Sequence, residues 1–341
     1  MTVRPLAGRS HPQYGFEHLS HQLLTIGVLP VLLIVSIAVM AVFEQKFFGL
    51  NNLFNVLRST SFLAIVAAGQ MLVLIVRGLD LSVGAVIALT STVTAQSMAE
   101  LSAVMPGQTG LIIALGVLAG LGCGLFIGLI NGLCVALLKV SPFMVTLGTL
   151  SIATGLALLL TQGIPVYGMP DTFVRDFGRA LWFGLPTTVY LALAIIALVW
   201  FMQTRTRIGR YQYAVGGNLQ AAIVSGVPAT LHIVLAYVMC SLLAATAGVL
   251  MTARLGSGQA TMGGNIIMLQ SIAAAVIAGV SLRGGVGKVE MVALSALFLS
   301  ILTNAMNLLR VDSKMQVVVL GFILVLAGAL NEYASRRRMH G

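Results

Sequence analysis

The segment Gly78–Gly84 places an acid, Asp80, and a hydroxyl, Ser82, between two long apolar runs. Residues 59–76 before it and 81–99 after it contain no charged side chain. A carboxylate at membrane depth is energetically costly, so such residues usually face a protein interior or a water-filled path. Glycines at both edges of the segment allow the backbone to bend where a helix would otherwise continue. Asp80 and Ser82 are therefore candidates to line a path for a solute.

Asp80 has two other interpretations. It could pair with Arg77 at a membrane boundary as a structural tie, or it could relay protons, as intramembrane acids often do. The short interval between Arg77 and Asp80 favours the ion pair. Other apolar runs contain amide side chains that could hydrogen-bond the hydroxyls of a solute or join neighbouring helices. These amides are Asn131, Gln270, Asn304 and Asn307.

The composition is that of a membrane protein. The chain has 341 residues, of which 58% are hydrophobic and only 8% are charged, whereas a soluble protein of this size exposes a surface much richer in charge. The net charge of +10 then indicates basic cytoplasmic loops rather than a nucleic-acid surface. Three cysteines in apolar runs and five scattered histidines match neither a disulfide framework nor a metal site, so no metal is expected.

The apolar runs predict an all-α, polytopic membrane protein with about ten transmembrane helices and both termini in the cytoplasm. The predicted spans are residues 23–43, 59–76, 81–99, 110–138, 142–162, 182–202, 231–253, 266–282, 289–309 and 315–333. With this topology twelve Lys and Arg residues lie on the inner side and seven on the outer side, which is the bias expected of cytoplasmic loops. Residues 1–22 and 334–341 are then cytoplasmic tails, the second one basic. The transmembrane domain is 23–333, with an inner loop at 203–230.

One predicted span, residues 110–138, contains a glycine at every fourth position from Gly116 to Gly132. Residues at this spacing lie along one helix face, where glycine lets another backbone approach closely. We expect this face to pack against a neighbouring helix. The alternative is a smooth wall along which a solute slides.

The inner loop holds a polar segment with clear helix-capping signals. Asn218 is a good N-cap, Gly226 is a good C-terminal stop, and Pro228 prevents continuation. A helix of about two turns is expected between them. Such a helix could dock in a groove of a partner protein or rest on its own bundle, and the residues alone do not separate the two.

Six motifs stand in order along the chain: Gly78–Gly84, Gly209–Asn218, Ala221–Val227, Ala253–Gln259, Gly279–Gly287 and Asn304–Leu309. Together they resemble the permease subunits of bacterial sugar ABC importers of the ribose, arabinose, xylose and galactose type. The resemblance covers nearly the whole chain after the first predicted span.

The resemblance implies a pore-forming subunit that works as a homodimer in membrane lipid. It would receive a sugar from a periplasmic sugar-binding protein and be driven by a separate ABC ATPase, which binds ATP and Mg. By the same analogy residues 217–227 form the coupling helix that docks in the ATPase. The coupling residues implied are Arg210, Gly217, Asn218, Ala221, Ala222 and Gly226.

No ATP site is expected in this chain itself, and no cofactor. Gly284–Lys288 resembles part of a phosphate-binding loop. Such a loop needs glycine at position 282 and Ser or Thr at position 289, but these positions are Leu282 and Val289. The glycines are better explained as a helix break near the cytoplasmic surface.

The longest outer loop, residues 163–186, carries charges that suggest a short helix at the surface. They are Asp171, Arg175, Asp176 and Arg179. Such a rim could dock a binding protein through complementary charge. An ordinary solvated face is the alternative.

The sequence therefore predicts a multi-pass protein of the bacterial inner membrane that imports a pentose or hexose by alternating access and is not itself an enzyme. One alternative is an ion-coupled secondary transporter with Asp80 as its coupling site. Another is a permease of the same class for an amino acid or a nucleoside. A membrane-embedded enzyme is disfavoured, because the nine acidic residues form no cluster with histidine at the spacing that catalysis requires.

Overall fold

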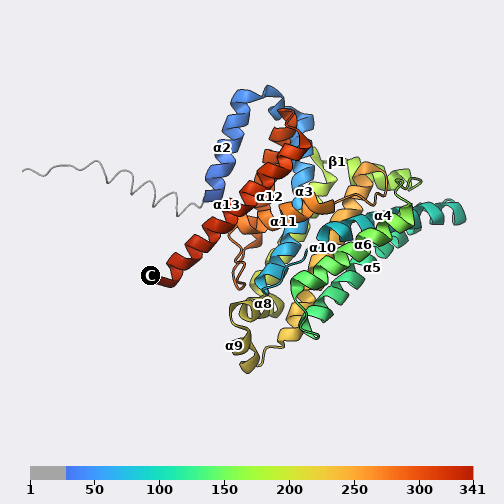
Figure 1. Cartoon of the computed structure of the whole chain (residues 1–341). Coiled ribbons are helices and arrows are strands. Elements are labelled where there is room, and N and C mark those ends of the chain that lie inside the picture. The colour runs from blue at the N-terminus through green and yellow to red at the C-terminus, as the bar shows by residue number, and fades with distance from the viewer. Residues whose placement is uncertain (1–27, 341) are drawn as a thin grey trace, which may run out of the picture.

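The computed structural model describes residues 28–340, so the predicted tail 1–22 and the start of the span 23–43 lie outside the described part. Within it the chain is almost entirely helical (Figure 1). The long helices are α2 (Val28–Phe43), α3 (Leu50–Ile75), α4 (Val83–Val104), α5 (Thr109–Ala136), α6 (Pro142–Thr161), α7 (Thr187–Arg205), α10 (Ala229–Leu255), α11 (Gly264–Ile277), α12 (Val289–Leu308) and α13 (Ser313–His340). The short elements are η1 (Gln45–Phe48), η2 (Phe173–Arg179), β1 (Leu181–Trp182), β2 (Leu185–Pro186), α8 (Arg207–Gly217) and α9 (Leu219–Val224).

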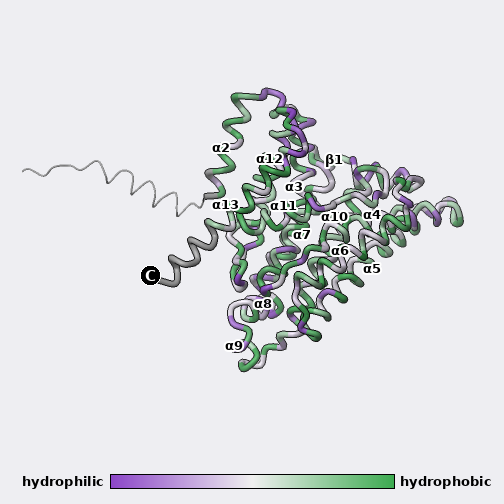
Figure 2. The backbone as a smooth tube through the Cα atoms, viewed as in Figure 1, coloured by the Kyte–Doolittle hydropathy of each residue, from purple (hydrophilic) through white to green (hydrophobic). Residues whose placement is uncertain are grey.

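Each predicted span overlaps one of the long helices, which supports a polytopic membrane protein. Six of the described helices are long and apolar enough to cross a membrane, and α2, α11 and α13 contain shorter apolar stretches. The most apolar stretch of α3 is 83% buried, against 28% for α5 and 22% for α6. Helix α3 is therefore central, whereas α5 and α6, which lie along one side of the molecule (Figure 2), expose many large apolar side chains, as lipid contact requires.

The glycine stripe of α5 packs against α4 and α10, as the sequence predicted. A Cβ atom on Gly128 would lie 2.7 Å from the Cα atom of Val238 in α10. At the other end of the stripe, a Cβ atom on Gly120 would collide with the side chain of Thr94 in α4. The helix backbones are in direct contact along this face, so it is a packing surface and not a wall for a solute.

We predict that Gly128→Val destabilises the protein in detergent, whereas Gly122→Val on the open side of α5 does not. Within 4 Å of a Cβ atom built on Gly122 there is no neighbouring atom, so the two variants change helix propensity equally but packing differently. Overpacking costs about 1–3 kcal/mol. The midpoint of thermal unfolding, followed by size-exclusion chromatography, should fall by several degrees for Gly128→Val alone. Equal midpoints would contradict the close α5–α10 contact.

Several parts of the structure differ from the predicted boundaries. Helix α3 begins at Leu50 instead of residue 59, because its polar first turns lie at the end of the bundle and remain helical there. Helix α7 begins at Thr187 instead of residue 182, because β1 and β2 form an antiparallel pair just before it. The inner loop holds an additional helix, α8, which buries Gln212 and Gly216 on one face.

Helix α11 is not the full span predicted at residues 266–282. Its 14 residues rise about 21 Å at about 1.5 Å per residue, which is less than the hydrocarbon thickness of about 30 Å. Residues 256–263 before it are not helical and run along α4 toward its first turn. There a Cβ atom on Gly263 would lie 2.7 Å from the carbonyl oxygen of Gly84. The starts of α4 and α11 therefore meet backbone to backbone inside the bundle.

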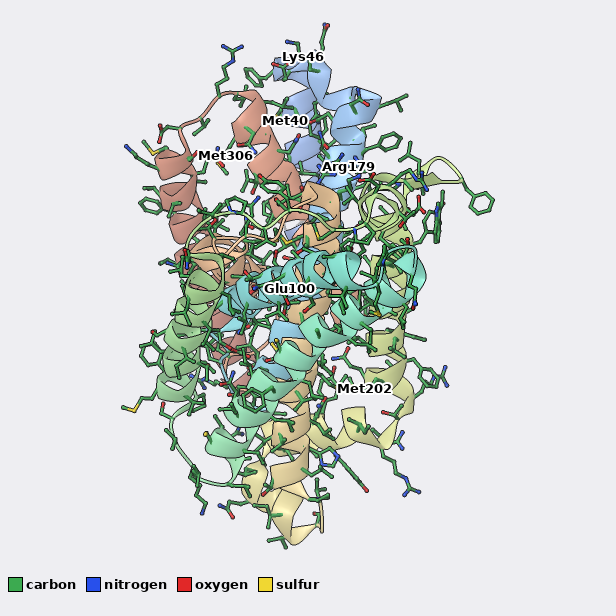
Figure 3. All side chains as sticks on the ribbon, turned by 90° about the vertical axis from the view of Figure 1, so that its right-hand side faces the viewer. Met40, Lys46, Glu100, Arg179, Met202 and Met306 are labelled. Carbon is green, nitrogen blue, oxygen red and sulfur yellow. The ribbon has the colours of Figure 1, made fainter. Side chains whose placement is uncertain are left out.

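The bundle has two distinct ends. Lys46 and Arg179 lie toward one of them, which we call the Lys46 end (Figure 3). Helices α8 and α9 lie at the opposite end, which we call the α8 end (Figure 1). Arg77, predicted on the inner side, bonds to Gly216 of α8. This grouping agrees with the two sides to which the basic residues were assigned.

Candidate functional site

A cavity of about 360 Å³ lies between α3, α10, α11 and α12. Its polar wall consists of amides and hydroxyls: Asn55, Ser59, Gln270, Ser300, Thr303, Asn304 and Asn307. The apolar wall consists of Phe62, Leu63, Met251 and Ile267. No charged side chain stands among these lining residues. Because amides and hydroxyls both donate and accept hydrogen bonds, the wall suits a neutral solute rich in hydroxyls.

Three of the six residues predicted for a solute path line this cavity, and each also joins two helices. Gln270 Nε2 donates to Thr303 Oγ1 at 3.2 Å. Asn304 and Asn52 exchange hydrogen bonds of 2.9 and 2.8 Å. Asn307 Oδ1 accepts from α13 at 2.8 Å. These amides therefore face a cavity and also join helices, and their contact with a solute stays a prediction.

Four polar wall residues were missed by the sequence reasoning, although a usable signal was present. Ser300 and Thr303 stand on α12 with the two asparagines already predicted, at helical spacing on one face. Asn55 and Ser59 stand one turn apart on α3. The predicted span 59–76 did not include Asn55, and Ser59 was its first residue. A polar stripe with helical period inside an apolar run would have identified them.

The other three predicted path residues lie elsewhere, and none of them lines the cavity. Asp80 Oδ1 accepts hydrogen bonds from the backbone N–H of Ser82 at 2.8 Å and from its hydroxyl at 2.6 Å. Asn131 Nδ2 of α5 donates to Ser82 Oγ at 3.0 Å. All three side chains are fully buried. The carboxylate stands at the start of α4, where the helix dipole favours a negative charge.

The ion pair expected between Arg77 and Asp80 is not formed. Arg77 Nε donates to the carbonyl of Gly216, and its Nη2 donates to that of Gly217, both at 2.6 Å. These acceptors are at the end of α8, far along the chain from Arg77. The sequence favoured Asp80 because it lies near Arg77 along the chain. Spacing along a chain does not show which remote backbone carbonyls lie close in space.

The ends of α3 and α8 and the loop before α12 meet at the α8 end in what we call the glycine junction, formed by Ile75, Gly216 and Gly285. The backbone N–H of Gly285 donates to the carbonyl of Ile75 at 2.9 Å. A Cβ atom on Gly216 would collide with that same carbonyl oxygen. The hydroxyl of Tyr213 donates to the carbonyl of Gly287 at 2.6 Å. Helix α8 is therefore fixed to the loop that connects α11 and α12.

Helix α9 follows the junction directly and has the predicted caps. Asn218 Oδ1 accepts from the backbone N–H of Ala221 at 3.0 Å. Gly226 has a φ of +79°, a conformation that favours glycine and ends the helix. The helix itself covers Leu219–Val224 and is therefore shorter than the predicted range 217–227.

The two faces of α9 differ sharply. Ala222 is 5% exposed and packs against Val215 of α8 and Ala229 of α10. Val224 is 89% exposed and Ile223 is 50% exposed. One face thus rests on the bundle, and the other presents apolar side chains away from it.

At the Lys46 end, Arg175, Asp176 and Arg179 of loop 163–186 lie in the expected short helix, η2. Arg175 Nε donates to Asp176 Oδ1 at 2.7 Å. This hydrogen bond raises the pKa of Arg175 and lowers the pKa of Asp176. Arg179 instead donates to the carbonyl of Arg254 at 3.3 Å, and Asp171 is exposed.

We predict that Gly216→Ala loosens the glycine junction, whereas the neighbouring Gly217→Ala leaves it intact. A Cβ atom on Gly217 would have no neighbouring atom within 4 Å. Hydrogen exchange followed by mass spectrometry should show faster exchange over residues 279–288 for Gly216→Ala only, since the Gly285 amide loses its partner. Unchanged exchange in Gly216→Ala would contradict the close approach to Ile75.

Apolar helices around a neutral polar cavity, with a capped helix at one end, define a polytopic membrane permease. The chain belongs to the family described as branched-chain amino acid transport system / permease component, which matches residues 52–328. It is a multi-pass protein of the inner membrane.

The resemblance to sugar permeases found in the motifs is confirmed by full-length relatives. The ribose import permease protein RbsC of Escherichia coli (strain K12) is 37% identical over 303 residues, covering 87% of this chain and 90% of the relative. The D-allose transport system permease protein AlsC of the same strain is 34% identical over 86% of each chain. Its galactose/methyl galactoside import permease protein MglC is 34% identical over 92% of this chain and 95% of the relative. No solved structure gives a significant match.

Proposed function

We propose that this chain is the permease subunit of an ATP-driven importer that carries a monosaccharide, a pentose or a hexose, into the cytoplasm. The neutral cavity is the observation that carries the proposal. Sugars are uncharged polyols, and each hydroxyl can both donate to and accept from an amide or hydroxyl wall. The cavity volume of about 360 Å³ falls in the range of small-molecule sites, about 300–1,000 Å³. The names of the ribose, allose and galactose relatives support the same class of solute.

The chemistry of the cavity argues against an amino acid as the solute. An amino acid would bring an ammonium and a carboxylate, which need charged or strongly polar partners once they leave water. The lining residues supply no charge. Ion coupling through Asp80 has weaker support as well, because this carboxylate is fully buried outside the cavity. We assign Asp80, Ser82 and Asn131 to holding the segment before α4 in place.

In this proposal the chain works as a homodimer in membrane lipid, with a periplasmic sugar-binding protein at the Lys46 end and an ABC ATPase at the α8 end. The ATPase binds ATP and Mg and hydrolyses the ATP. The charge bias that puts the α8 end in the cytoplasm supports this arrangement. The charged rim of η2 faces the side from which the sugar arrives.

Helix α9 is the proposed docking element for the ATPase. Its outward apolar residues, Ile223 and Val224, together with the exposed Ala221, suit a groove in a partner. Asn218 and Gly226 cap the helix and fix its length. Buried Ala222 holds it on the bundle, Gly217 joins it to the glycine junction, and Arg210 adds a positive charge on α8. These six coupling assignments remain proposals.

A path for the coupling motion leads from α9 to the cavity. Helix α8 is held to the loop before α12 by the Tyr213 hydroxyl and by close glycine contacts. That loop follows α11 directly, and α11 contributes Ile267 and Gln270 to the cavity wall. A push on α9 would therefore move one wall of the cavity and change the side to which it opens, as alternating access requires.

The proposed function is tested by reconstituting this chain in liposomes with the binding protein and ATPase encoded beside it. Uptake of radiolabelled sugar should require all three proteins and ATP. Thr303→Val, which removes a cavity hydroxyl at nearly constant volume, should lower the uptake rate about threefold to tenfold, as the loss of one hydrogen bond implies. Thr303→Ser, which keeps the hydroxyl, should retain the wild-type rate.

Two outcomes would contradict the proposal. Uptake by the purified chain alone under an ion gradient would indicate a secondary transporter. Uptake of an amino acid or nucleoside in preference to every monosaccharide would keep the ATP-driven class but refute the assigned solute.

We also predict that Val224→Asp separates this chain from its ATPase without unfolding it. The side chain is 89% exposed, so the bundle tolerates the charge, but a docked apolar face would not. Co-purification of the ATPase with the tagged permease should fall at least about tenfold, as for loss of an interface hot spot. Val104→Asp at the end of α4, another exposed valine (75%), serves as a control that should leave co-purification intact. Normal ATPase binding by Val224→Asp would exclude α9 as the docking helix.

A further inference from the structure

Three arginines from three separate elements gather at the Lys46 end. Arg58 of α3 donates to the carbonyl of Arg179 at the end of η2, at 3.3 Å. Arg179 in turn donates to the carbonyl of Arg254 near the end of α10, at 3.3 Å. Arg254 Nη2 donates to Asn55 Oδ1 at 3.1 Å. We call Arg58, Arg179 and Arg254 the arginine triad.

Backbone carbonyls and an amide hold the triad together, and no carboxylate in residues 28–329 forms an ion pair with any of the three. Within that part of the chain the ion pair that does form joins Arg175 to Asp176. The charges of Arg58 and Arg179 both repel that of Arg254, and the Nε of Arg58 is buried without a hydrogen-bond partner. Like charges held together destabilise the fold, so the arrangement calls for an anionic group from outside this part of the chain.

The triad is adjacent to the cavity. Asn55, which accepts from Arg254, is itself a lining residue, and Arg58 directly precedes the lining residue Ser59. The cavity wall below contains no charge. The positive charge therefore lies beside the cavity, where it can attract an approaching partner. It does not lie in the wall that would contact the neutral solute.

The surface beside the triad has the composition of a protein docking site. After Arg179 the chain enters the β1–β2 hairpin, whose tip carries Phe183, 99% exposed, and Trp182, 49% exposed. Arginines and exposed aromatic side chains are the residue types enriched at protein interfaces. A small anion would need only the guanidinium groups and would leave the aromatic tip unexplained.

We propose that the arginine triad receives carboxylate side chains of the protein that delivers the sugar, and so places that protein over the cavity. This inference rests on the proposed function. It moves the docking role of the predicted rim from Asp171, Arg175 and Asp176 to Arg179, because Arg175 and Asp176 already neutralise each other. Complementary charges of this kind speed association and make it depend on salt.

The test uses the complete importer in nanodiscs and measures ATP hydrolysis against the concentration of sugar-loaded binding protein. In the triple variant Arg58→Gln, Arg179→Gln, Arg254→Gln, the concentration for half-maximal stimulation should rise by about tenfold or more. The stimulated rate at saturation should be retained. In the wild type this concentration should rise with ionic strength, and in the triple variant it should hardly change. Lys46→Gln removes one charge from the same end outside the triad and should behave as the wild type.

A reciprocal experiment guards against misfolding of the triple variant. Arg179 is exposed, so Arg179→Glu alone should fold, bind the ATPase and lose stimulation at low concentrations of binding protein. Replacing the facing carboxylate of the binding protein with arginine should restore the stimulation of ATP hydrolysis.

The outcomes separate the two proposals. An unchanged half-maximal concentration and salt dependence in the triple variant, with normal stimulation of the wild type, would overturn the docking surface alone. Variants that change only the requirement for anionic lipid would identify a lipid contact and would overturn it as well. A wild-type importer that no sugar-loaded binding protein stimulates would overturn the proposed function, and the docking surface with it.

Discussion

Backbone N–H and C=O groups cannot be left unpaired in a bilayer, and this constraint governs the arrangement of the whole bundle. Helices α4 and α11 both start inside it, so the segments before them need partners from neighbouring helices. The carbonyl of Leu79 accepts from Thr146 Oγ1 at 3.3 Å. The backbone N–H of Gln259 donates to Ser91 Oγ at 3.2 Å. The non-helical segments before α4 and α11 are possible because protein surrounds them. Asp80 belongs to the first of these segments and is therefore fully buried.

The same interruptions give α11 a special place in the bundle. Its first residue touches the start of α4 through backbone atoms at Gly84, and the loop after its last turn joins the glycine junction. Between these two points it supplies Gln270 to the cavity. One element therefore connects the cavity with the helix proposed to dock the ATPase.

Charge is distributed differently over the cavity and the two ends of the bundle. The lining of the cavity is neutral, the α8 end carries the arginines of the inner loop, and the Lys46 end carries the arginine triad. A neutral interior lets a polyol exchange water for amides and hydroxyls without desolvating an ion. In the proposed function, charge at the two ends serves contacts with other proteins. Membership of a permease family and this pattern point to the same class of function.

The sequence by itself determined the helical class, the caps of α9, the packing role of the glycine stripe and the family, because these depend on local spacing and on residue types. It also singled out Gln270, Asn304 and Asn307, which line the cavity. Only the tertiary structure decided that Arg77 bonds to α8 instead of Asp80, that α11 is too short to cross the membrane alone, and that three distant arginines meet. Each of these depends on which remote backbone or charge lies within a few ångströms, and periodicity along a chain contains no information about that distance.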